Sequence, residues 1–403
     1  MDLFEKCTAF TKPNEYKEKG LYPYFHCLES RQAKEVTMEG KRRIMLGSNN
    51  YLGLTTCPQV MEAASKALEK YGTGCSGSRF MNGTLDLHVE LERKLASFLG
   101  VEDVITFPTG FQTNVGIISS IVGRNDHVIC DRENHASIYD GCRLSLGTML
   151  RYHHSDMDEL ERMLRKVPEE SGCLIVTDGV FSMKGDICRL PEIVELAKRY
   201  GARIMVDDSH ALGVIGKGGR GTASHFGLEG EVDITMGTFS KSFASLGGFM
   251  AGSHLAVDYA RHTSRPFIFS ASMTPANTAG ALAALEYLEG HPDIVEKLKS
   301  IADYTRMSFR RHGIGIVDSP TPIIPIMTRT ADYTLELARN LYDNGVYVNP
   351  VLPPGVPEGE CLLRVSLMAT VTEDLVDEAA QIIAAEIAKL DEKYGNAEGT
   401  IAV

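Results

Sequence analysis

A chain of 403 residues is too long for one simple hydrophobic core, so we expect one large domain with smaller parts attached to it. The composition, with 43% hydrophobic and 23% charged residues, is typical of a globular protein, and a formal net charge of −12 without long runs of one sign argues against nucleic-acid binding. The nine cysteines are scattered and contain no C-x-x-C pair, which argues against both a disulfide framework and a metal site.

Residues 1–48 are expected to form an N-terminal arm. Within it, "EVTMEGKRRIML" (35–46) predicts a small β-hairpin that turns at Glu39-Gly40. Residues 1–20 lack the basic and apolar regions of a signal peptide, and no apolar stretch in the chain approaches the roughly 18 residues of a membrane span. We therefore expect a cytoplasmic location, with at most peripheral contact at the inner face of a membrane.

Residues 49–290 alternate between short apolar runs and helical periods, a pattern typical of an α/β domain with a largely parallel sheet covered by helices. Helices are predicted over 85–100 and 190–201, both of which end in Gly. A further strand is expected to end at His153-His154, a pair in which we see no metal site. The other predicted strands are "DVITF" (103–107), "HVICD" (127–131), "CLIVTD" (173–178), "RIMVDD" (203–208), "DITMG" (233–237) and "GGFMAG" (247–252).

Residues 291–403 show a different pattern, which predicts a separate C-terminal α+β domain. It begins with a long helix over 291–313 and ends with another over about 373–392. Between them we predict strands near 323–328, 346–348 and 362–367 and a helix over 332–344.

Polar and glycine-rich segments follow several of the predicted strands. Because open parallel sheets bind ligands beyond the carboxyl ends of their strands, these segments are expected to meet at one site. They contribute, in chain order, Gly110 and Phe111, then His135, then Asp207 and His210, and finally Thr238, Ser240 and Lys241.

This set of side chains suits pyridoxal phosphate. A lysine such as Lys241 can bond to the cofactor aldehyde, and a buried aspartate such as Asp207 can keep the pyridine nitrogen protonated. One imidazole can stack on the ring, and a second can donate to its phenolic oxygen. Backbone N–H groups at the Gly110 helix start, with hydroxyls nearby, can hold the phosphate.

Each residue also has an ordinary structural interpretation. Lys241 alone would usually be a solvated surface lysine. Asp207 or its neighbour Asp208 could be a turn aspartate at the end of a strand, and His135 could be a structural histidine. Their joint placement at strand ends is what favours the cofactor site.

Motifs along nearly the whole chain resemble those of the α-oxoamine synthase family of fold-type I pyridoxal-phosphate enzymes. The resemblance runs from "LGSNNYLGL" (46–54) to "LLRVSLMATVT" (362–372). It implies an aspartate aminotransferase-like fold with a mostly parallel, seven-stranded sheet flanked by helices. Within the family the chain looks most like the bacterial serine palmitoyltransferases. The segments that carry this closer likeness include "GTFSKS" (237–242), "RPFIFSAS" (265–272) and "YVNPVLPP" (347–354).

The resemblance also implies roles by position. Lys241 is similar to the lysine that bonds to the cofactor, Asp207 to the aspartate at the pyridine nitrogen, and His210 to the histidine near the phenolic oxygen. His135 matches the histidine on the ring face. The phosphate-binding positions are matched by Gly110, Phe111, Thr238 and Ser240.

Further positions are implied outside that set. Asn50 matches an asparagine near the substrate, and Arg364 matches the arginine that holds the substrate carboxylate. Ser270, Ala271 and Ser272 match a segment that reaches the cofactor of a partner subunit, which implies a homodimer with shared active sites.

The implied reaction is the condensation of L-serine with a long-chain acyl-CoA, such as palmitoyl-CoA, to 3-ketodihydrosphingosine, CoA and CO2. Glycine C-acetyltransferase and 8-amino-7-oxononanoate synthase are sister branches with the same fold and cofactor, and mainly "TFSKS" argues against them. A non-catalytic binding subunit is a further alternative, although such subunits lack the lysine that Lys241 matches. Two departures from the serine palmitoyltransferase pattern are Phe111, where Tyr is frequent, and "PPGVP" (353–357), where "PPATP" is frequent.

Overall fold

The structure is a computed structural model that describes residues 2–395 and divides into two compact units. The large unit contains residues 49–299 and 320–322. The small unit contains, among the described residues, 2–48, 300–319 and 323–395. The arm at the N-terminus therefore groups with C-terminal residues in one unit. The division of the chain at residues 48 and 290 into three parts stays a prediction.

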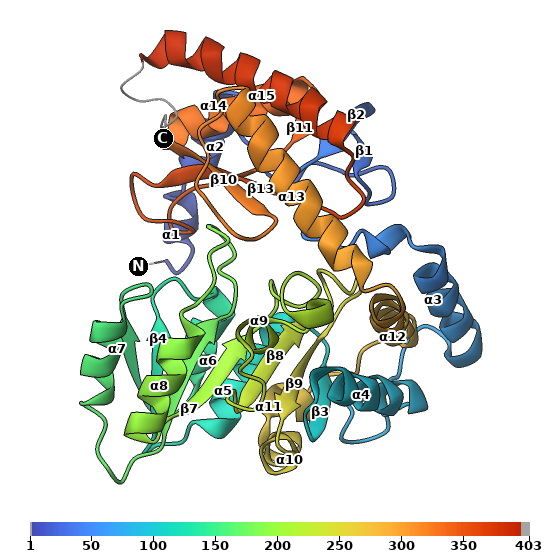
Figure 1. Cartoon of the computed structure of the whole chain (residues 1–403), viewed down its shortest axis with the longest axis vertical. Helices are drawn as coiled ribbons and strands as arrows, with labels where there is room; N and C mark the ends of the chain where they lie inside the picture. Colours follow the sequence, from blue (N-terminus) through green and yellow to red (C-terminus); the bar gives the residue numbers. More distant parts are fainter. Residues whose placement is uncertain (1, 396–403) are drawn as a thin grey trace. The chain divides into compact units, whose positions relative to one another are not determined.

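The large unit is built on a seven-stranded sheet, as predicted (Figure 1). The strand order is β3-β9-β8-β7-β6-β4-β5, and β9 runs antiparallel to both of its neighbours while the other pairs are parallel. The bounds are β3 Asp103–Phe107, β4 His127–Asp131, β5 Thr148–Tyr152, β6 Cys173–Asp178, β7 Arg203–Asp207, β8 Ile234–Thr238 and β9 Gly248–Gly252.

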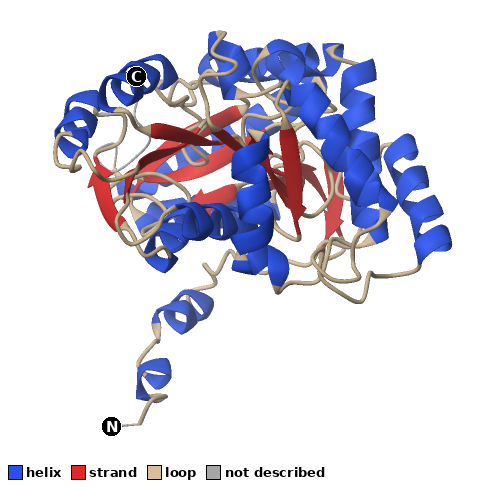
Figure 2. Ribbon diagram, turned by 90° about the horizontal axis from the view of Figure 1, so that it is seen from below, coloured by secondary structure: helices blue, strands red, loops and turns tan. Residues whose placement is uncertain are grey.

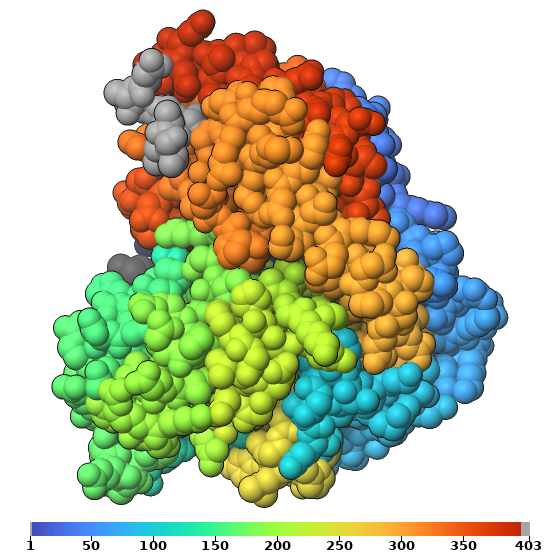
Figure 3. All heavy atoms as spheres, viewed as in Figure 1, coloured from blue at the N-terminus to red at the C-terminus, as the bar shows by residue number. Residues whose placement is uncertain are grey.

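Helices cover both faces of this sheet, which explains why its strands are almost continuously apolar. Successive strand residues point to opposite faces. Val128 and Cys130 of β4 pack in a core with helices α5, α6, α10 and α11, whereas Ile129 packs in a second core with α7 and α8. The space-filling view shows residues in the green of α7 and α8 on the visible face of the large unit (Figure 3). The helix bounds are α5 Gly110–Ile121, α6 Ala136–Leu144, α7 Met157–Leu164, α8 Leu190–Tyr200, α10 His254–Thr263 and α11 Arg265–Ile268.

Three further helices of the large unit pack together, one of them, α4, against β3. Helix α12 lies against both α3 and α4. Their bounds are α3 Pro58–Tyr71, α4 Asp86–Leu99 and α12 Pro275–Gly290, and the short helix α9 spans Thr222–Phe226. Helix α4 begins and ends within one residue of its predicted range.

The small unit contains two three-stranded sheets, ordered β1-β2-β11 and β10-β13-β12. The predicted hairpin is confirmed, because Met38 pairs with Lys41 across Glu39-Gly40. The β2 strand also pairs in parallel with β11, and this contact joins the arm to C-terminal residues. The strand bounds are β1 Glu35–Met38, β2 Lys41–Met45, β10 Ile323–Arg329, β11 Val346–Tyr347, β12 Asn349–Val351 and β13 Cys361–Ser366.

Helices α14 (Ala331–Asp343) and α15 (Glu373–Tyr394) pack against each other, and both contribute to the core of the small unit. Helix α13 (Asp293–Arg311) contributes Ile301, Ala302 and Phe309 to the same core. The short helices α1 (Glu5–Thr8) and α2 (Lys12–Glu18) project outward and have no buried residue (Figure 2). Between residues 2 and 395, no helix combines the length and apolar character needed to cross a bilayer.

Candidate active site

A cavity of about 240 Å³ lies at the carboxyl ends of β4, β6, β7 and β8 in the large unit. Eight residues singled out from the sequence line it together: Gly110, Phe111, His135, Asp207, His210, Thr238, Ser240 and Lys241. The structure therefore brings these strand-end segments together in one cavity, as expected from the sequence. The other lining residues are Thr109, Asn114, Ser137, Asp178, Val180, Ser209, Met236 and Leu246.

Lys241 is half-buried in the segment that connects β8 to β9. Both ends of this segment are held, since Thr238 pairs with Gly248 in the sheet and Phe239 N donates to Gly247 O at 2.9 Å. Phe239 and Phe243 are fully buried on either side of the lysine, with ring centroids 5.9 Å apart. The backbone of Lys241 is thus fixed by packing, while its side chain lines the cavity.

Asp207 and Asp208 are neighbours in the chain but face different surroundings. Asp207 lines the cavity, where its Oδ1 accepts from Ser209 N at 2.9 Å and its Oδ2 accepts from Asn114 Nδ2 at 2.7 Å. Asp208 instead accepts the hydroxyl and backbone N–H of Thr222, at 2.5 and 2.9 Å. Burial raises the pKa of Asp208 to about 7, against the lowering effect of the Thr222 hydrogen bonds. Asp207 is therefore the carboxylate available to a ligand.

The start of α5 and the hydroxyls after β8 form a cradle of donors. Thr238 Oγ1 lies 2.9 Å from Ser240 Oγ and donates to Gly247 O at 2.9 Å. A Cβ atom on Gly110 would lie only 2.8 Å from Thr238 Oγ1, so a larger residue would fill the cradle. Free N–H groups and the dipole at a helix start favour an anion such as a phosphate.

The two histidines of the cavity follow different strands, His135 after β4 and His210 after β7. His135 precedes α6, its Nδ1 lies 2.7 Å from Ser137 Oγ, and its backbone N–H donates to Asp178 Oδ2 at 3.0 Å. Although the His135 side chain is open to the cavity, the surrounding protein lowers its pKa by desolvation, opposed by Asp207 and assisted by Lys241. His210 is buried, and its Nδ1 lies 2.7 Å from the hydroxyl of Tyr51.

Sequence reasoning did not single out Asn114, Ser137 or Asp178. Asn114 donates to both Asp207 and Ser137, so it connects the aspartate to the His135 segment. Burial, and then the charge of Asp207, raises the pKa of Asp178 well above its ordinary value. Asn114 lies one helical turn after Gly110, and Asp178 ends a predicted strand. Those positions were the signals that could have identified them.

Five predicted site residues do not line this cavity. Asn50 is buried and its Nδ2 donates to Thr55 Oγ1 at 2.7 Å. Ser270 Oγ accepts from Gln112 Nε2 at 3.1 Å, and Ser272 Oγ donates to Gly77 O at 3.0 Å, with Ala271 between them. Arg364 lies on β13 of the small unit, where it is buried and donates to Ser366 Oγ at 3.1 Å. Their assigned roles stay predictions.

The cavity fits pyridoxal phosphate in the chemistry of its donors. It offers an amine, a carboxylate held by two hydrogen bonds, an open imidazole and a cradle of hydroxyls at a helix start. These match the aldehyde, the pyridine nitrogen, the ring face and the phosphate of that molecule.

Comparisons with known proteins agree with this fit. A family model described as aminotransferase class I and II matches residues 41–383. The chain is 52% identical to the serine palmitoyltransferase of Sphingobacterium spiritivorum over 379 residues, which cover 94% of this chain and 95% of that protein. It is 43% identical to 8-amino-7-oxononanoate synthase 1 of Bacillus velezensis over 370 residues, which cover 92% of this chain and 95% of that one.

Among solved structures, one of SPT that contains PLP as an internal aldimine is similar with a TM-score of 0.94 at 35% identity, covering 97% of this chain and 99% of that chain. The fold, the donor set and these relatives identify pyridoxal phosphate as the cofactor. The chain therefore belongs to the class I and II aminotransferase family, as a pyridoxal-phosphate-dependent α-oxoamine synthase.

Proposed function

We propose that the protein is a serine palmitoyltransferase, which condenses L-serine with a long-chain acyl-CoA and releases CoA and CO2. The observation that carries this proposal is the higher identity to serine palmitoyltransferases, 52% over 379 residues, than to 8-amino-7-oxononanoate synthases, 43% over 370 residues. We place it in the cytoplasm as a homodimer, in which Ser270, Ala271 and Ser272 of one subunit reach the site of the other.

The side chains of the cavity divide the work of this reaction. When bound, pyridoxal phosphate supplies an aldehyde for amines and a ring that withdraws electrons from the substrate Cα. Lys241 Nζ would hold the cofactor through its aldehyde, and the same amine would move the Cα proton of serine. Asp207 keeps a proton on the pyridine nitrogen, and Asn114 and Ser209 N–H hold that carboxylate in place.

The remaining residues orient the reactants. His135 would hold the ring face and the serine carboxylate, and Arg364 would also bind that carboxylate. Holding the carboxylate would orient serine for removal of the Cα proton before CO2 is lost. His210, whose Nδ1 lies 2.7 Å from the Tyr51 hydroxyl, would donate to the phenolic oxygen. Gly110, Thr238 and Ser240 would bind the phosphate.

A product assay with purified protein tests the proposal. L-serine, glycine and L-alanine are each combined with acetyl-, pimeloyl- and palmitoyl-CoA, and the amino ketone is identified by mass spectrometry. We expect serine with palmitoyl-CoA to give the highest kcat/KM. An apolar tunnel would favour the long chain by about 0.8 kcal/mol for each buried methylene. Faster turnover of glycine with acetyl-CoA, or of alanine with pimeloyl-CoA, would move the protein to a sister branch.

Gly110→Ala is expected to weaken cofactor binding about tenfold or more, equivalent to about 1.4 kcal/mol. The added Cβ would lie 2.8 Å from Thr238 Oγ1 and 3.0 Å from Thr238 Cβ, within the cradle assigned to the phosphate. Titration of the cofactor-free protein, followed by visible absorbance, measures the dissociation constant. Gly290→Ala is the matched control, because a Cβ there meets no atom within 4 Å. Equal affinities for the two variants would contradict the phosphate assignment.

Arg364→Ala is expected to raise the KM for serine by about one to two orders of magnitude and to change the KM for acyl-CoA much less. The reason is the loss of a charge-assisted hydrogen bond to the carboxylate of only one substrate. Steady-state kinetics with each substrate varied in turn gives both constants. Arg310→Ala, at an exposed arginine on α13, is the control. A shift confined to acyl-CoA would remove Arg364 from the serine site.

A further inference from the structure

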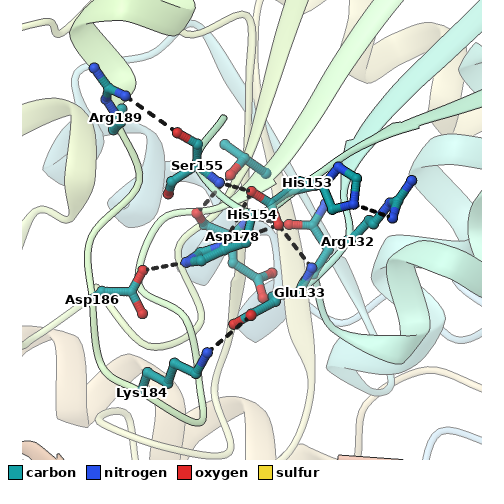
Figure 4. A network of polar contacts seen from close by, with 12 residues as sticks. Arg132, Glu133, His153, His154, Ser155, Asp178, Lys184, Asp186 and Arg189 are labelled. Carbon is teal, nitrogen blue, oxygen red and sulfur yellow. Dashed lines mark hydrogen bonds and ion pairs between the residues drawn. The ribbon is translucent and has the colours of Figure 1, made fainter. Parts of the chain in front are cut away.

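A histidine outside the cavity lining bridges two acidic side chains near the site. His154 follows β5, and its Nδ1 lies 3.1 Å from Asp131 Oδ1 while its Nε2 lies 2.8 Å from Asp186 Oδ2. Figure 4 shows His154 at the centre of this network, with Asp186 on one side of it. The ring of Phe181 packs edge-on against the imidazole, with centroids 4.4 Å apart. Both ring nitrogens of His154 are thus engaged.

The two carboxylates belong to different loops, and each loop carries a residue of the cavity. Asp131 ends β4, and its Oδ1 also accepts the backbone N–H of Glu133, in the short turn that leads to His135. Asp186 belongs to the loop after β6, in which Phe181 N donates to Asp186 O and Val180 pairs with Ile187. That loop begins at Asp178 and Val180, which line the cavity.

The same two loops touch each other directly at the cavity. The backbone N–H of His135 donates to Asp178 Oδ2 at 3.0 Å, and Asp178 N donates to Asn134 Oδ1 at 2.9 Å. His154 adds a second connection between the two loops, and an ion pair of Glu133 with Lys184, 3.1 Å apart, adds a third. The His135 turn is therefore held next to the cavity by Asp178, and also by the Asp131–His154–Asp186 bridge and by Lys184.

The charge of His154 strengthens this bridge. Burial alone would lower the pKa of His154, but hydrogen bonds and charge interactions with Asp131 and Asp186 outweigh it and raise the pKa to about 10. The imidazole is then protonated at neutral pH, and each ring nitrogen donates to a carboxylate. Charge-assisted hydrogen bonds of this kind are stronger than neutral ones.

We propose that His154 is a positioning residue for the reaction, whose imidazolium bridge between Asp131 and Asp186 sets the placement of His135 against the cofactor ring. The inference rests on the proposed role of His135 at the ring. A histidine that only stabilised the fold would affect unfolding but leave the folded site unchanged. A positioning histidine changes the environment of the bound cofactor and the rate of the reaction in protein that is still folded.

His154→Gln tests this, with His153→Gln as the matched control. His153 is the preceding residue, but its side chain is 62% exposed, and it pairs with Glu159 and with the exposed Arg132 rather than with Asp131 or Asp186. In cofactor-loaded, folded protein we expect His154→Gln to change the visible circular dichroism of the bound cofactor and to lower kcat by about 10- to 100-fold. The KM for serine should change less than threefold, about 0.65 kcal/mol. His153→Gln should match the parent in both measurements.

Asp186→Asn provides a second variant, because it removes the charge at the far end of the bridge with almost no change in shape. It should reproduce the spectral and kinetic changes of His154→Gln, and it decides the matter if His154→Gln does not fold. The circular dichroism readout needs no acyl-CoA, so it remains valid even if the proposed substrates are wrong. Unchanged dichroism and kcat in folded His154→Gln or Asp186→Asn, or the same losses in His153→Gln, would overturn the proposal.

Discussion

Lys241→Ala is expected to remove the yellow colour of the protein and to lower turnover by at least about three orders of magnitude, or about 4 kcal/mol of transition-state stabilisation. Alanine has no amine to bond to the cofactor or to move the Cα proton, and no neighbouring side chain in the cavity is another lysine. The fold should persist, because the segment is held by buried Phe239 and Phe243 rather than by the lysine. Absorbance spectra and CoA release measure the two effects.

Lys217→Ala serves as the control, since Lys217 is exposed and outside the cavity lining. It should keep the colour and the turnover of the parent. Substantial turnover by Lys241→Ala, with the colour retained, would show that Lys241 neither holds the cofactor nor moves the Cα proton.

Asp207→Asn is expected to retain bound cofactor but to slow the reaction about a thousandfold, because a neutral amide no longer holds a proton on the pyridine nitrogen. The loss of a paired charge in a site shielded from water costs several kcal/mol. The amide also creates a local conflict. Asn114 Nδ2 and Ser209 N both donate to Asp207, so the NH2 group of an asparagine would face one of these donors. Single-turnover rates with serine measure the effect.

Asp208→Asn is the matched comparison at the adjacent position. Its carboxyl accepts from Thr222 and does not line the cavity, and its pKa of about 7 means that the protonated form is already populated near neutral pH. This variant should therefore keep most of the activity, whatever its effect on stability. If Asp208→Asn were the inactive one of the two, the assignment of Asp207 to the pyridine nitrogen would be wrong.

The central strands of the large unit were predictable because helices bury them on both faces. The runs at 103–107, 127–131 and 173–178 match β3, β4 and β6. The predictions for β7 and β9 differ by one residue at one end, and the prediction for β8 is shifted by one residue. The meeting of Lys241, Asp207 and His135 in one cavity followed from the rule that parallel strands end at the same edge. Both results depend on local patterns and on general sheet geometry.

Other features depended on contacts that no local pattern records. Asn114 acts on Asp207 from a helix that is far away in the sequence, and an asparagine on a helix shows no sign of such a partner. The choice between Asp207 and Asp208 depends on which carboxylate Thr222 binds. The grouping of the N-terminal arm with C-terminal residues depends on the pairing of β2 with β11, across most of the chain.

The reversed direction of β9 has a consequence for how the cofactor is captured. If the strand after β8 ran parallel to it, the connection would need a dozen or more residues. Lys241 would then lie in a long crossover connection. Because β9 returns beside β8, residues 239–247 form a short connection pinned at Thr238 and Gly248. A short pinned connection has little conformational entropy to lose, so the amine stays at high effective concentration near the aldehyde. Capture of the cofactor from solution should therefore occur in a single kinetic phase, without a slow ordering step of the lysine segment.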